Sequence, residues 1–192
     1  EPDWEQGFHE LLLAAYLPAE DDRKTEHFDR AIRIFEASED EAMYGVALQE
    51  TISLFGLADT ELVKSNLYKA IDIMERHEVG NWHGHAQMYL GALLRLEGAY
   101  EDALAQLRPA AGQLLECGDL NCWGISTRLA AESELALGSV ASARARALAI
   151  HEVRDSLPMQ DSLLPRLLDL SAAVLSALGR HEAAATTLGR AM

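Results

Sequence analysis

The chain has 192 residues, of which 49% are hydrophobic, and carries 31 acidic against 16 basic side chains. No apolar run approaches the ~20 residues of a membrane-spanning helix, and a surface this negative repels phosphate backbones. We therefore expect neither membrane insertion nor direct nucleic-acid binding. Residues 1–50 hold 14 acids and 4 bases, which indicates either a solvated face or an end that docks a basic neighbour.

The first ten residues, EPDWEQGFHE, show neither the basic nor the apolar stretch of a signal peptide, and the chain does not begin with Met. Two cysteines, Cys117 and Cys122, are too few to staple a secreted domain of this length. We interpret both as reduced thiols and predict a cytoplasmic location. We also expect the chain to be a fragment of a larger protein.

Helical periodicity extends along the whole sequence. Residues 3–16 carry a one-sided apolar stripe of Trp4, Phe8, Leu11, Leu12 and Tyr16. Further helices are predicted over residues 20–37, 41–55, 60–78, 82–97, 100–116, 121–137, 139–157, 162–178 and 181–192. Ten helices in five hairpins with short loops follow. Pro109 removes a backbone donor, which predicts a kink or a restart near Leu107.

Glycines recur at a period of 39–41 residues, which indicates an internal repeat. One set comprises Gly45, Gly84 and Gly124, and the other Gly98, Gly138 and Gly179. Each member of the second set is followed two residues later by Tyr100, Val140 or His181, and five residues later by Ala103, Ala143 or Ala184. The glycine permits a left-handed helix cap, and the small alanine lets the next helix approach closely.

The stretch Leu90-Gly91, Leu94, Gly98, Tyr100, Ala103, Leu107, Ala110 resembles the tetratricopeptide repeat. The resemblance implies an all-α, right-handed alpha-alpha superhelix, a solenoid of about five helical hairpins. Residues 1–192 would form a single repeat domain, with a divergent and polar capping hairpin at 1–38 and repeats at 39–79, 80–118, 119–158 and 159–192. Two departures are the longer period and Leu115 in place of the closing proline of the family.

Two sequence segments are similar to the sensor repeats of bacterial signal-transduction ATPases and LuxR-type transcriptional regulators. They are LECGDLNCWGIS at 115–126 and SALGRHEAAATTLGRAM at 176–192. This resemblance implies a sensory or scaffolding region of a bacterial regulator. Its partner would be a protein, a peptide, a small effector or another domain of the same chain.

Catalytic signatures are missing from the sequence. It contains no phosphate-binding glycine loop, and no His-Glu pair is followed by the second histidine of a zinc protease. His77, His83 and His85 could collect a metal or sense pH, but His83 and His85 point in different directions on a helix, which favours an ordinary hairpin junction. We predict no catalytic residue, no metal and no cofactor, and an enzyme is the last-ranked hypothesis.

The resemblance also places a ligand groove on the first helix of each repeat. Its predicted residues are Gln49, Ser53, His85, Met88, Arg95, Arg128, Glu132, Arg166 and Asp169. The arginines among them would form a basic track suited to carboxylates of an acidic peptide or a C-terminus. The alternative is ordinary salt bridging, such as Arg128 with Glu132. We interpret Trp82 and Trp123 as wedges between hairpins.

A different class of function is self-association. The amphipathic helix predicted over 181–192 would leave Leu188 and Met192 uncovered, so that two chains could pair as a homodimer through this edge.

Overall fold

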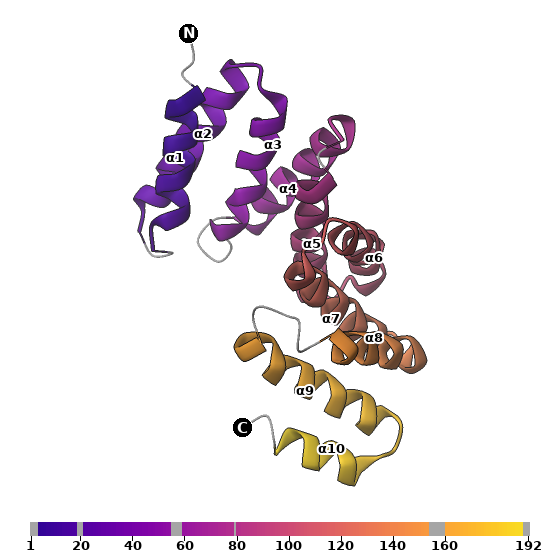
Figure 1. Ribbon diagram of the computed structural model, residues 1–192. Coiled ribbons are helices and arrows are strands. Elements are labelled where there is room, and N and C mark those ends of the chain that lie inside the picture. Colours follow the sequence, from indigo (N-terminus) through magenta and orange to yellow (C-terminus); the bar gives the residue numbers. More distant parts are fainter. Residues whose placement is uncertain (1–3, 19–20, 55–58, 79, 154–159, 190–192) are drawn as a thin grey trace. The chain divides into compact units, whose positions relative to one another are not determined.

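The computed structural model describes residues 4–18, 21–54, 59–78, 80–153 and 160–189 (Figure 1). In these ranges the chain forms ten α-helices and one short 3-10 helix, without a strand. The all-α class predicted from the sequence is therefore confirmed. No helix among the described residues is both long and apolar enough to cross a bilayer.

The helices follow the predicted order closely. They are α1 (Trp4–Tyr16), α2 (Arg23–Ala37), α3 (Glu41–Glu50), η1 (Thr51–Leu54), α4 (Thr60–Arg76), α5 (Gly80–Leu96), α6 (Tyr100–Glu116), α7 (Leu120–Ala136), α8 (Val140–Val153), α9 (Gln160–Ala177) and α10 (His181–Leu188). The end of the helix predicted to reach residue 157, and the last residues of the chain, lie outside the described ranges.

The chain divides into two compact units, Glu1–Tyr89 and Leu90–Met192, with the boundary inside α5. In the first unit α2 packs against α1 and α3, and α3 packs against α4. Phe28 and Phe35 of α2 are almost fully buried in its core, together with Leu48 of α3 and Met74 of α4. In the second unit α7 packs against α6, α8 and α9, and α9 packs against α10.

The buried face of α1 differs from the apolar stripe that the sequence predicts to be buried. Gly7, Leu11 and Ala14 are buried, and a Cβ atom at Gly7 would lie 2.9 Å from Ile34 Cγ2 of α2. The close approach at glycine brings this small-residue face, rather than the aromatic one, against α2. The rest of the stripe is exposed and comprises Trp4, Phe8, Leu12 and Tyr16. The exposed face of α1 is therefore apolar, and the capping role expected for the hairpin at 1–38 stays a prediction.

Four helix ends of the second unit close with the same turn. Gly98, Gly118, Gly138 and Gly179 all have φ between +73° and +82°. At Gly98, for example, the glycine N–H donates to the Arg95 carbonyl at 3.0 Å, and the Ala99 N–H donates to the Leu94 carbonyl at 3.0 Å. The left-handed caps predicted at Gly98, Gly138 and Gly179 are confirmed, because glycine reaches this backbone region without steric cost.

Small residues set the distance between α5 and α6. A Cβ atom at Gly91 would lie 2.5 Å from Leu107 Cγ and 3.2 Å from the Ala103 carbonyl oxygen. Ala103 and its repeat equivalents Ala143 and Ala184 are all buried. This burial confirms the packing role that the repeat pattern predicts for these alanines.

Helix α6 runs without interruption through Pro109. Of the kink or restart predicted near Leu107, the restart is therefore wrong, and the kink stays a prediction. Pro109 lies on the exposed side of the helix, while Leu107, Ala110 and Leu114 are fully buried. Packing of these neighbours holds both sides of the proline in one helix, although the proline itself donates no backbone hydrogen bond.

We predict opposite stability effects for alanine at two glycines of α6 and its turn. Gly98→Ala forces a side chain into a positive-φ conformation and should cost about 1–2 kcal/mol. Gly112→Ala lies inside α6 with no atom within 4 Å of its Cβ position, and should stabilise by roughly 0.5–1 kcal/mol. Urea unfolding followed by circular dichroism measures both effects, and equal shifts for the two variants would contradict the assignment.

Candidate functional site

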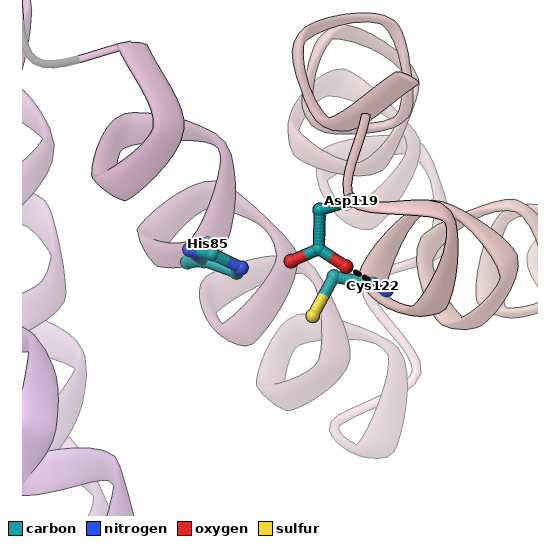
Figure 2. A group of neighbouring side chains, drawn as sticks. All are labelled: His85, Asp119 and Cys122. Atoms are coloured by element: carbon teal, nitrogen blue, oxygen red, sulfur yellow. Dashed lines mark hydrogen bonds between the residues drawn. The ribbon is translucent and has the colours of Figure 1, made fainter. Parts of the chain in front are cut away.

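Helix α7 is buried on nearly every side, and polar residues share its buried surface with apolar ones. Asp119 starts the helix by accepting a hydrogen bond from the Cys122 backbone N–H at 3.0 Å, drawn as a dashed line in Figure 2. Ser126 donates to the Leu107 carbonyl of α6 at 2.9 Å, and Ser133 donates to the Leu129 carbonyl one turn earlier at 2.9 Å. Two charged side chains of α7, Arg128 and Glu134, are buried as well.

The first charged cluster joins α5 to α7 through Glu132. Arg95 Nη1 lies 3.3 Å from Glu132 Oε2, and Arg128 Nη1 donates to Glu132 Oε1. The side chains of Arg95 and Glu132 are 27% and 25% exposed, whereas that of Arg128 is 8% exposed. These three predicted groove residues therefore do meet, in the salt-bridged arrangement named above as the alternative.

The same cluster has a positive excess, because two guanidinium groups share one carboxylate. The Nε atoms of Arg95 and Arg128 are buried and have no hydrogen-bond partner among the described residues. Buried N–H groups are rarely left without an acceptor, and satisfying one stabilises by about 1–3 kcal/mol when the partner is charged. The cluster thus has donors to spare for a further carboxylate, which would reach it beside the partly exposed side chains of Arg95 and Glu132.

The other predicted groove residues do not join this cluster. Gln49 is 1% exposed, and its Nε2 donates to Glu50 Oε1 at 3.3 Å, while burial raises the pKa of Glu50. Ser53 lies in η1 and donates to the Glu50 carbonyl at 2.9 Å. Met88 is 3% exposed, so it packs in the interior instead of facing a ligand. Two more of the predicted residues lie exposed on α9, namely Arg166 and Asp169.

His85, which Figure 2 labels with Asp119 and Cys122, is half-buried on α5. It belongs to the first unit, and Asp119 and Cys122 belong to the second, so neither unit holds all three side chains. We assign no metal site to them. His77 instead lies 2.7 Å from Glu41 Oε2, and the hydrogen bonds from His77 and Arg76 lower the pKa of Glu41.

A second charged cluster lies on α7, and the repeat pattern of the sequence does not predict it. Glu134 is 1% exposed, and its Oε1 accepts from Arg108 Nη2 of α6 at 3.1 Å and from Arg146 Nε of α8 at 2.9 Å. Its sequence signal is faint: Trp123, Thr127 and Glu134 follow each other at helical spacing, which puts a carboxylate on the same side of α7 as a tryptophan.

Comparisons with known proteins leave the family open. No protein-family model matches the chain, and no curated protein matches it.

We predict that the two thiols differ sharply in reactivity. Burial, with Asp119 adding a smaller contribution, raises the pKa of Cys122 to about 12, and neither thiol is in a disulfide. At pH 8 the thiolate fraction of Cys122 is then on the order of a thousand-fold below that of an ordinary cysteine. Iodoacetamide labelling with peptide mapping should modify the exposed Cys117 and leave Cys122 intact in the native protein. Equal labelling of both would contradict this environment.

Proposed function

We propose that the chain is a non-catalytic recognition domain that binds an acidic segment of a protein or peptide through Arg95 and Arg128. The observation that carries the proposal is the convergence of two guanidinium groups from different helices on a single carboxylate, with both Nε atoms left over. Arginine presents a planar fork of donors that matches a carboxylate, which supports this ligand class over a neutral one.

The Glu132 carboxylate occupies the position that a ligand carboxylate would take in this proposal. It occupies one guanidinium edge of each arginine, so an incoming carboxylate adds to the cluster or displaces Glu132. The chain carries a net charge of −15, so general electrostatics repels acidic peptides. Binding of such a peptide would therefore report a local site and not a long-range attraction.

The finer architecture is part of the proposal. The left-handed turns at Gly98, Gly138 and Gly179, with spacings of 40 and 41 residues, support a right-handed superhelix of tetratricopeptide type. We propose that such an array serves as the sensory or scaffolding region of a bacterial transcriptional regulator. This part of the proposal rests on the resemblance of segments 115–126 and 176–192 to the sensor repeats of such regulators.

The proposal predicts binding of a fluorescein-labelled tetra-glutamate peptide, measured by fluorescence anisotropy. Arg95→Ala and Arg128→Ala should each weaken binding about tenfold, which corresponds to ~1.4 kcal/mol for one lost charged contact. Glu132→Gln should strengthen binding, because it removes the competing carboxylate. Arg144→Ala removes the same charge from an exposed position of α8 and should have little effect.

A tetra-lysine peptide of the same length serves as the ligand control, and thermal unfolding of each variant checks that the fold is retained. Failure of the tetra-glutamate peptide to bind, or an equal loss in the Arg144→Ala variant, would rule the site out.

One observation favours self-association as a second candidate. The aromatic stripe of α1 is exposed, with Tyr16 at 85% and Trp4 stacked on Phe8 at a ring-centroid distance of 5.5 Å. At the other end, Leu188 of α10 is 46% exposed, while Met192 lies outside the described residues. Contiguous exposed apolar surface of this kind marks interaction sites, and a second copy of the chain could cover the stripe.

Light scattering coupled to size exclusion tests this candidate. Self-association predicts a dimer that persists when Arg95, Arg128 and Arg166 are changed to alanine and that dissociates in Phe8→Ser. Leu62→Ser removes an apolar side chain of α4 that is 55% exposed, against 39% for Phe8, and should leave the dimer intact. A wild-type chain that is monomeric at all accessible concentrations would exclude self-association.

A further inference from the structure

A groove of about 580 Å³ runs between α6 and α8, with α7 as its floor. Its walls are mostly small or apolar residues, and its lining includes Arg108, Gly112, Trp123, Thr127, Glu134 and Arg146. This volume falls within the range of about 300–1,000 Å³ that is typical of small-ligand sites. All three helices belong to the second unit, so the groove is formed within one compact body.

This groove lies on a different side of α7 from the Arg95–Glu132–Arg128 cluster. At about 100° per residue, Thr127 and Glu134 point roughly 100–160° away from Arg128 and Glu132 around the helix axis. The two clusters share no residue. Ligand binding in the groove is therefore independent of the Arg95–Glu132–Arg128 cluster.

Two buried acceptors on the groove floor have no donor. Glu134 Oε2 and Thr127 Oγ1 are buried and without a hydrogen-bond partner among the described residues, although Glu134 and Thr127 are only 1% and 3% exposed. A buried carboxylate oxygen or hydroxyl normally has a partner, and leaving it without one destabilises the fold. Both residues line the groove, so a ligand N–H group there would satisfy them.

The groove also offers donors. Arg108 and Arg146 each use one guanidinium nitrogen on Glu134 Oε1, which leaves further N–H groups on both. Their side chains are 54% and 26% exposed, so both remain accessible from solvent. With one carboxylate between two guanidinium groups, the cluster has a net positive charge and can hold a second carboxylate.

We propose that this groove binds an apolar amino-acid residue with a free α-carboxylate. The carboxylate binds the arginine N–H groups, and the side chain packs on Trp123 between the alanines of α6 and α8. The ammonium group of a free amino acid can donate to both Glu134 Oε2 and Thr127 Oγ1. The C-terminal residue of a peptide presents the same carboxylate and side chain, and its single amide N–H donates to one of these two atoms.

Isothermal titration calorimetry with four probes distinguishes these sources. L-leucine tests the free amino acid, and N-acetyl-alanyl-leucine tests a peptide C-terminus. L-leucinamide and N-acetyl-alanyl-leucinamide are the matched controls without the carboxylate. Binding of either acid, with at least tenfold weaker binding of its amide, supports the proposal, and the identity of the acid assigns the source.

Two variants locate the binding. Gly112→Leu fills the wall of the groove without touching a charge, and no atom lies within 4 Å of its Cβ position, so the fold should tolerate it. It should abolish binding of the acid probe, and Arg146→Gln should weaken it at least tenfold. Arg144→Gln removes an exposed arginine of α8 outside the groove and should leave binding unchanged.

Three results would overturn the proposal. They are no detectable binding of either acid at millimolar concentration, equal binding of the acids and their amides, and undiminished binding in Gly112→Leu. Leucine or the acetylated dipeptide should still bind to the Arg95→Ala and Arg128→Ala variants. This result would separate the groove from the tetra-glutamate site, so that either proposal can be refuted without refuting the other.

Discussion

The burial of two opposite charges in α7 is the constraint on which the second unit depends. Arg128 and Glu134 are both buried, and a charge in a protein interior is tolerated only when it is paired and hydrogen-bonded. Arg128 finds Glu132, which also pairs with Arg95 of α5. Glu134 finds Arg108 of α6 and Arg146 of α8. The central helix is thereby connected by charge to three neighbouring helices, which fixes their register beyond what alanine and leucine packing specifies.

Both charged clusters contain buried atoms that have no hydrogen-bond partner among the described residues. Each has two arginines and one carboxylate, so each has a positive excess on a chain whose net charge is −15. Around the first cluster the unsatisfied atoms are donors, and around the second they are acceptors beside arginines that still have N–H groups to offer. We therefore propose that one helix presents two surfaces of different chemistry, one for acidic groups and one for a ligand that combines a carboxylate with an N–H donor.

Much of the local structure could be predicted from the sequence because it depends on short-range chemistry. The turns at Gly98, Gly138 and Gly179 need a residue that tolerates positive φ, and the pattern identifies them. Tertiary contacts decided the rest. Packing of Gly7 against α2 exposes the aromatic face of α1, and Met88 is buried although its repeat position predicts a groove. Arg95, Arg128 and Glu132 were identified because a repeat pattern aligns them, whereas the Glu134 cluster depends on long side chains that meet across three helices.

Arginine Nε–H resonances in ¹H–¹⁵N spectra test most directly whether the buried Nε–H groups of Arg95 and Arg128 bind a carboxylate. We expect two Nε–H signals that are protected from exchange with water and that shift together during titration with tetra-glutamate. Arg95→Lys and Arg128→Lys assign them. The Arg144 Nε–H signal, from an exposed side chain, should stay in place. Rapid exchange of both signals in the free protein, or no shift at saturating peptide, would contradict the account.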